Sequence, residues 1–176
     1  MNYYLYQSDS DTYHVLAPRP PTAPADLLRL RGEPIRDTWK PLAVRLELVN
    51  KPGDFPRFAG HIPVLSDRAL TTLSPLVNDY VEVLPLNLED TRFGDVHALH
   101  VLPVLDCLDP EKAIVKRFDD GTILSIRHYA FREEAIAGAP LFRIKGYEFS
   151  HCYVSDDFRR TVESAKLKGL VFRNLP

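Results

Sequence analysis

Apolar and polar positions follow the same local pattern twice along the chain. The stretches 64–86 and 153–175 each begin with apolar residues and a Ser-Asp pair, continue with apolar residues at helical spacing, and end in a short apolar run. An offset of 89 residues aligns the two stretches without a gap and places Ser66 onto Ser155. The pattern predicts two copies of one unit, a capped helix that crosses a sheet and returns as a strand.

The helices of these two units are predicted at 66–77 and 155–166. A Ser-Asp pair is typical of a helix start, because its side chains accept hydrogen bonds from free amides and the aspartate faces the positive end of the helix dipole. Apolar residues three or four positions apart then form one stripe on each helix. The stripes consist of Leu70, Leu73 and Leu76 or Val77 in the first helix, and of Phe158, Val162 and Ala165 in the second.

Most of the remaining chain has the character of strands. Apolar and polar residues alternate over 42–48, and 112–131 is typical of a hairpin with its turn at 119–121. Further strands are predicted within 2–7, 80–86, 97–109, 140–154 and 170–172. We therefore expect an α+β fold in a single domain, residues 1–176, in which two main helices pack on a mixed or mainly antiparallel sheet of six to eight strands.

Two irregular segments fall in the region 1–60, which is predicted to hold strands and a Pro-rich loop ahead of the repeated units. Four prolines between Pro18 and Pro24 predict an extended loop, and a short helix is expected at 25–30. The segment Asn50–Pro63 holds two glycines and three prolines and is predicted to be a long loop. Long loops often carry binding residues, although many only cover the edge of a core.

Composition narrows the class of protein. The chain has 176 residues, of which 45% are hydrophobic, enough for the core of one domain. It contains no apolar run long enough to span a membrane, and its start lacks the pattern of a secretory signal. We therefore expect a cytoplasmic protein without membrane insertion. Cys107 and Cys152 are interpreted as small core residues, with a disulfide as the alternative.

Charge is distributed unevenly along the chain, although the net charge is only −2. Residues 67–120 hold 11 Asp and Glu against 5 Lys and Arg, whereas 121–176 hold 9 Lys and Arg against 6 Asp and Glu. The acidic middle third disfavours nucleic-acid binding through that surface. It is suited to attracting a basic partner, unless it is only a solvated surface.

The candidates for chemistry all have structural alternatives. His97 and His100 have the spacing of a metal pair on a helix, but in the strand predicted here they point to opposite faces. Asp106, Asp109 and Glu111 are suited to acid–base work or to a cation, but an Asp-Pro step among them indicates a turn. Neither cysteine has a histidine placed to activate it. We expect no catalytic residue, cofactor or metal.

The order of segments nevertheless resembles a known family. Five pieces carry the resemblance, and they are Ser66-Asp67-Arg68, Leu84-Pro85, Leu105-Asp106-Cys107-Leu108-Asp109, Val154-Ser155-Asp156 and Lys168-Gly169-Leu170-Val171-Phe172. They are similar to the eleventh family of bacterial immunity proteins of polymorphic toxin systems, formerly a domain of unknown function. The resemblance covers about residues 60–176. It departs from the family pattern after Asp109, where a serine is expected and Pro110-Glu111-Lys112-Ala113 follows.

The resemblance implies a cytoplasmic protein that neutralises a cognate toxin, encoded next to it, by direct contact, and that needs no catalytic apparatus. The first alternative is a regulatory or assembly subunit that binds another protein. The second, which the sequence favours less, is an uncharacterised hydrolase. The matching residues are scaffold positions, so the contact surface is predicted from charge and from the 50–63 loop instead. The predicted contact residues are Glu89, Asp90, Asp95, Asp109, Glu111, Phe55, Arg57 and Phe58.

Overall fold

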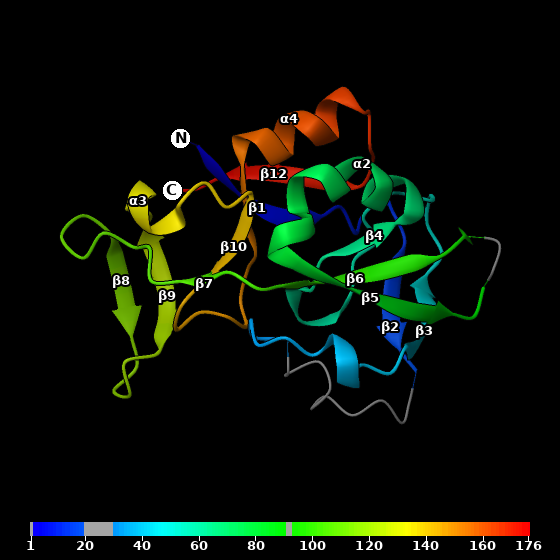
Figure 1. The fold of residues 1–176 in the computed structure, drawn as a ribbon, viewed down its shortest axis with the longest axis horizontal. Coiled ribbons are helices and arrows are strands. Elements are labelled where there is room, and N and C mark those ends of the chain that lie inside the picture. Colours follow the sequence, from blue (N-terminus) through cyan, green and yellow to red (C-terminus); the bar gives the residue numbers. More distant parts are fainter. Residues whose placement is uncertain (1, 20–29, 91–92) are drawn as a thin grey trace.

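The repeated sequence pattern forms two strand–helix–strand units in the computed structural model, which describes residues 2–19, 30–90 and 93–176 (Figure 1). The helices begin and end close to the predicted positions. The first unit consists of β4 (Val64–Ser66), α2 (Asp67–Val77) and β5 (Val81–Leu88). The second consists of β11 (Tyr153–Ser155), α4 (Asp156–Ser164) and β12 (Leu170–Asn174).

An antiparallel strand from outside each unit lies between the two strands of that unit. In the first unit this strand is β6 (Val96–Val101), which pairs with both β4 and β5 and follows β5 directly in the chain. In the second unit it is β1 (Tyr3–Ser8), which pairs with both β11 and β12 and comes from the N-terminus. Each unit is therefore a β-α-β crossover split by an inserted strand.

The described residues form two five-stranded sheets and a hairpin, so the expected single sheet of six to eight strands is wrong, while the α+β class with two main helices is confirmed. The first sheet has the order β12-β1-β11-β10-β7 and the second β2-β3-β5-β6-β4. Both are mixed, because β10 pairs with β7 and β3 with β5 in parallel. The other strands are β2 (Val15–Pro18), β3 (Leu42–Leu48), β7 (Val104–Leu105), β8 (Ile114–Arg117), β9 (Ile123–His128) and β10 (Leu141–Ile144).

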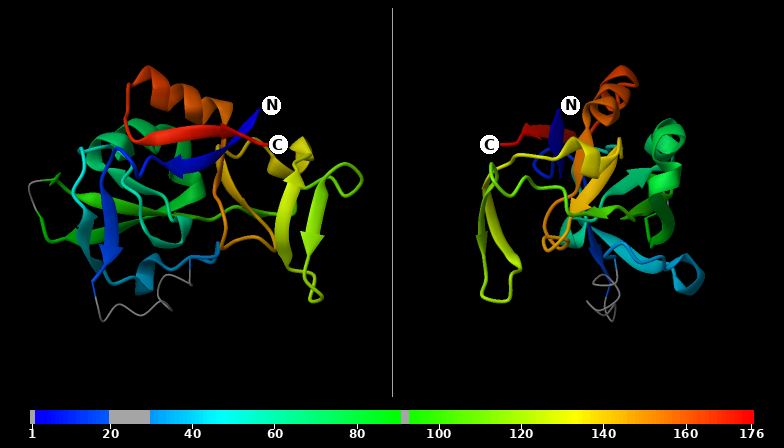
Figure 2. Two further views of the ribbon diagram at one scale, coloured as in Figure 1. Left: turned by 180° about the vertical axis from the view of Figure 1, so that it is seen from behind. Right: turned by 60° about the vertical axis from the view of Figure 1, so that its left-hand side comes forward.

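The two helices pack against each other over one shared core (Figure 2). Leu73 and Val77 of α2, and Phe158 and Val162 of α4, are buried there as the apolar stripes predict. The α2 stripe is rotated slightly, since Ala69 is buried while Leu70 and Leu76 are only partly buried. Inward-facing residues of both sheets complete this core, which explains why one local pattern occurs twice. Those residues include Tyr4, Tyr6, Leu65, Val81, Leu99, Val101 and Val154.

The outer faces of the two sheets are covered by different elements. An aromatic cluster around Phe142 and Tyr153 lies on the outer face of the first sheet, under the β8–β9 hairpin and the short helix α3 (Glu133–Ile136). The chain segment from Leu30 to Trp39 covers part of the second sheet. The hairpin was predicted correctly, and its two strands form their own sheet at one end of the molecule (Figures 1 and 2). Residues 25–29 of the helix predicted at 25–30 and most of the Pro18–Pro24 loop lie outside the described residues, and Leu30 is not helical.

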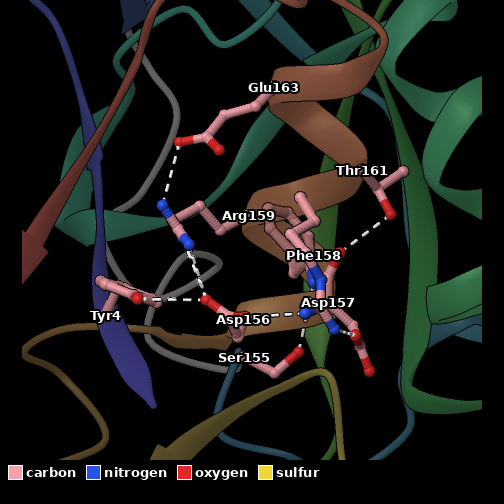
Figure 3. Close-up of polar contacts among 9 residues, drawn as sticks. Tyr4, Ser155, Asp156, Asp157, Phe158, Arg159, Thr161 and Glu163 are labelled. Carbon is pink, nitrogen blue, oxygen red and sulfur yellow. Dashed lines mark hydrogen bonds and ion pairs between the residues drawn. The ribbon is translucent and has the colours of Figure 1, made fainter.

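Both serine caps form as predicted. Ser66 Oγ accepts a hydrogen bond from the Ala69 amide at 3.2 Å, and Ser155 Oγ accepts one from the Phe158 amide at 3.2 Å. The Asp156 carboxylate beside the second cap accepts hydrogen bonds from the Tyr4 hydroxyl of β1 at 3.1 Å and from Arg159 (Figure 3). This side-chain contact fastens the helix α4 to the inserted strand.

A buried carboxylate in the 50–63 loop connects the two units. Asp54, which is 7% exposed, accepts hydrogen bonds through Oδ1 from Ser66 Oγ at 3.0 Å and through Oδ2 from the Lys168 amide at 2.8 Å. Its backbone amide and carbonyl bind Lys168 and Ser66 as well. Arg68 adds an ion pair to Asp54 at 3.3 Å and donates to the Ala165 carbonyl at the end of α4. The start of α2 and the turn after α4 are thus held by one side chain.

Replacing this carboxylate is expected to destabilise the protein strongly. Asp54→Ala leaves the Lys168 amide and the Ser66 hydroxyl without their acceptor, and we expect the free energy of unfolding to fall by about 3 kcal/mol. Asp11→Ala, at an exposed aspartate, is the control and should change it by less than about 0.5 kcal/mol. Urea denaturation followed by circular dichroism measures both. Equal midpoints for the two variants would contradict this role of Asp54.

Candidate functional site

The predicted acidic contact residues do not form one surface. Glu89, Asp90 and Asp95 flank the turn between β5 and β6, whereas Asp109 and Glu111 lie before β8, at the opposite end of the long axis of the molecule (Figure 1). Glu89 is also in an ion pair with Arg19, which follows β2. The acidic residues counted together in the sequence therefore lie in two separate places in the structure.

Asp109 has the structural role that the Asp-Pro step predicts. Its Oδ1 accepts hydrogen bonds from the amides of Glu111 at 2.9 Å and Lys112 at 3.2 Å, which closes the turn before β8. The Glu111 amide and then the hydrogen bonds and charge of Lys112 lower the pKa of the Asp109 carboxyl. The chemistry of Asp109 is that of a turn residue.

The 50–63 loop is packed closely onto the fold. Phe55 is 0% exposed and Phe58 is 4% exposed, so both rings belong to the core and neither is available to a partner in this structure. Arg57, between them in the chain, is exposed. Its amide donates to the His14 carbonyl and its carbonyl accepts from the Leu16 amide, which fixes its backbone beside β2.

Arg57 lies in a cleft of about 730 Å³ formed where the outer edges of the two sheets meet. One wall consists of apolar residues of β2, including Val15 and Ala17, and the other of residues of β1 and β12. The short 3₁₀ helix Ala59–His61 and the loop before β11 complete it. A cleft of this size is within the range of ligand sites.

The titratable side chains of the cleft are mostly basic. Arg57 and Arg173 line it together with His61 and His151, and Glu47 of β3 is the acidic residue among the lining side chains that the structure describes. Arg173 projects from β12, whose pairing with β1 fixes its backbone. The arginines are exposed, so their charges are accessible from solvent.

The two histidines contact each other. Their ring centroids are 4.6 Å apart, and the rings meet edge to face. His61 has a φ of 55°, a left-handed conformation that is uncommon for residues other than glycine. Its carbonyl accepts a hydrogen bond from Arg143 Nη2 at 3.2 Å, which helps to hold this conformation.

Arg143 of β10 lies buried beneath His61, with an exposed fraction of 2%. Its other terminal nitrogen donates to the Glu148 carbonyl at 2.7 Å, and its Nε has no partner among the residues that the structure describes. Burial lowers the pKa of the Arg143 guanidinium, but arginine stays protonated in proteins, so the buried group keeps its positive charge. That charge adds to the positive potential behind the cleft.

The surroundings keep both cleft histidines neutral at pH 7. Desolvation, followed by the charges of Arg143 and Arg57, lowers the pKa of His61, although part of that residue remains exposed to solvent. Desolvation, followed by His61 and Arg143, lowers the pKa of His151. A negative charge placed in the cleft would oppose these effects and favour protonation of both rings.

A second buried polar group holds the segment after residue 30 onto the second sheet. His100 Nδ1 and Glu82 Oε2 are 3.0 Å apart, and the Gly32 amide donates to His100 Nε2 at 3.0 Å, so Nδ1 carries the proton. Glu82 also accepts from the Ile35 and Arg36 amides. These hydrogen bonds outweigh desolvation and lower the pKa of Glu82. The polar contacts of His100 and Glu82 therefore have a structural role, which is to hold this segment on the sheet.

The histidines and cysteines considered as candidates for chemistry do not come together in one site. As predicted, His97 and His100 point to opposite faces of β6, and His97 Nε2 lies 2.6 Å from Asp67 Oδ1 at the start of α2. Burial raises the pKa of the Cys107 thiol to about 12 and that of Cys152 to about 11, so both stay protonated. Both cysteines are free and buried, which confirms their role as core residues.

The cleft has the chemistry of an anion-binding surface, and sequence reasoning missed it. Among the residues that the structure describes, no three His, Cys, Asp or Glu residues are placed to hold a metal ion. The cleft residues come from six separate parts of the chain, and no motif surrounds His61 or His151. Two of the lining residues, Arg57 and Phe58, were predicted as contact residues, and Phe58 is buried.

Acid is expected to destabilise the protein through its histidines. Burial lowers the pKa of His14, His61, His100 and His151 in the folded state, so below the unfolded value of about 6.5 the unfolded chain binds more protons. The free energy of unfolding should therefore fall as the pH is lowered from 7.5 to 5. Urea denaturation at several pH values measures this slope. His100→Asn should flatten it, whereas His128→Asn, at an exposed residue of β9, should not.

Comparison with protein families places the whole chain in one of them. The model of the immunity protein family Imm11 matches residues 4–175. The match includes residues 4–60, where β1, β2 and β3 are built into the two sheets and the resemblance in sequence is only loose. No curated protein matches the chain. By the extent of the family match, the chain belongs to the immunity protein family Imm11.

Proposed function

We propose that this protein protects the cell that makes it by binding a cognate protein toxin and neutralising it through direct contact. The observation that carries the proposal is the family match over residues 4–175. The toxin is expected to be encoded next to this chain and to meet it in the cytoplasm. A rigid scaffold with a complementary surface is sufficient for this task, because neutralisation by contact needs no catalytic step.

Several features of the fold support a binding role. The shared core and the Asp54 contacts hold the two units in one arrangement. Little of this protein therefore has to become ordered when a partner binds, which lowers the entropy cost of binding. The basic cleft and the acidic turn between β5 and β6 supply surfaces of opposite charge.

Within residues 2–19, 30–90 and 93–176, none of the helices is both long and apolar enough to cross a membrane.

Growth of bacteria that express the neighbouring gene tests the proposed function. We expect the product of that gene to stop growth by itself, and co-expression of this chain to restore it. Purified toxin and purified chain should then form a complex, detected by isothermal titration calorimetry. Asp54→Ala serves as the control, because a destabilised chain should protect less at raised temperature. Killing that persists with abundant folded chain would refute the pairing.

The acidic turn between β5 and β6 is proposed to accelerate capture of the toxin. Glu89, Asp90 and Asp95 lie together at one end of the molecule, whereas Asp109 and Glu111 lie at the other. The wall of the cleft leads to this turn, because β2 is followed by Arg19, which pairs with Glu89. Exposed charges of one sign raise association rates at low ionic strength and act less at high salt.

Charge reversal measures the contribution of this turn. The variant with Glu89→Lys, Asp90→Lys and Asp95→Lys is expected to associate with the toxin about tenfold more slowly at low salt, and the difference should shrink at about 0.5 M salt. Glu111→Lys with Asp119→Lys and Glu134→Lys changes the net charge equally at the hairpin end and should have a smaller effect. Stopped-flow kinetics compares the two. Unchanged association of the first variant at low salt would remove the turn from the contact surface.

A further inference from the structure

We infer that the basic cleft is the anchoring site for the toxin, and that it takes an acidic segment of that protein, with aspartate or glutamate side chains placed between Arg57 and Arg173. This inference rests on the proposed function and adds the surface and the chemistry of the partner. It differs from an expectation based on the acidic middle third of the sequence, because the charged side chains that line this cleft are mostly basic.

The charge of the cleft favours carboxylates. Arg57 and Arg173 contribute two positive charges against the one negative charge of Glu47, and the buried Arg143 adds a third positive charge beneath His61. Arginine presents a planar set of donors that matches the two oxygens of a carboxylate. Both arginines line the cleft, and neither forms an ion pair with another of the residues that the structure describes.

The cleft is held in shape before any partner arrives. The Arg57 backbone is bound to β2 on both sides, through His14 and Leu16, and the Arg173 backbone is paired with Leu5 of β1. The two arginines stand on different walls, since one belongs to the loop beside the second sheet and the other to β12 of the first sheet. Because the backbone of each arginine is already held, a partner binds with little loss of backbone freedom in the protein.

The shape and lining of the cleft fit a segment of chain better than a small anion. Its volume of about 730 Å³ is large for one anionic group, and Val15, Ala17 and Pro18 form an apolar strip along one wall. An extended acidic segment would place carboxylates on the arginines and its aliphatic carbons on that strip. The histidine pair His61 and His151 at the cleft can then accept protons, because nearby carboxylates favour their charged forms.

Charge reversal in the cleft tests this assignment, with the toxin from the neighbouring gene as the probe. The variant with Arg57→Glu and Arg173→Glu is expected to weaken the equilibrium affinity about 100-fold or more, and growth protection should be lost with it. The matched control has Lys116→Glu and Arg127→Glu, two exposed residues of the hairpin, with the same change in net charge. The control should lose less than about tenfold. Thermal denaturation establishes that both variants are folded, and Arg57→Gln with Arg173→Gln replaces the first variant if it is not.

Proton uptake provides a second, independent readout. Calorimetry of the wild-type complex at pH 7 in buffers of different ionisation enthalpy should show net proton uptake on binding, and His61→Asn with His151→Asn should remove it. Carboxylates near His61 and His151, with Arg57, Arg143, Arg173 and Glu47 around them, account for that uptake. A complex that forms without proton uptake contradicts the presence of an acidic segment at the histidines.

The outcomes separate the two proposals. If the wild-type chain neither binds the neighbouring toxin nor protects against it, the proposed function itself is wrong. If the wild-type chain binds and protects, but the cleft variant keeps its affinity within about threefold of the control, the toxin contacts another surface and only the cleft assignment is wrong. Selective loss of affinity in the cleft variant, with proton uptake in the wild type, supports the assignment.

Discussion

The contacts of one buried carboxylate determine how the two halves of this protein meet. Asp54 lies in the loop between β3 and β4 and binds the start of α2 on one side and the turn after α4 on the other. The residues that it joins, Ser66 and Lys168, are more than a hundred positions apart in the chain. A buried carboxylate is stable only where donors surround it, so the loop can occupy just the arrangement that provides them. These contacts hold together the two helices that enclose the apolar core.

The shared apolar core explains why the sequence pattern occurs twice. A strand–helix–strand unit leaves one face of its helix and one face of its strands apolar, and two units placed face to face cover each other. Each unit is completed by a strand from elsewhere, β6 in one case and β1 in the other. The N-terminal strand is thus an internal part of the second unit. The family match, which begins at residue 4, is consistent with this dependence.

The cleft follows from the same arrangement. The inner faces of the two sheets share one core, and the cleft lies where the edge strand β2 of one sheet meets the edge strand β12 of the other. Residues of unrelated segments line that space, and their charges add together although they are dispersed in sequence. Positive charge gathered in a concave, partly desolvated place acts more strongly than the same charge on a flat surface. An immunity protein that uses this cleft would combine a rigid fold with a charged recess.

Local features of the chain were determined by the sequence alone. Both helix starts, both apolar stripes and the hairpin turn depend on residues within four positions of each other, so their patterns are visible in the sequence. The division into two sheets, the burial of Phe55 and Phe58, and the separation of Asp109 from Asp95 depend on pairings between distant segments. So does the placement of Arg57 and Arg173 in one cleft. No local signal encodes such pairings, because they result from which strand fills the gap in each unit, and only the tertiary structure decides that.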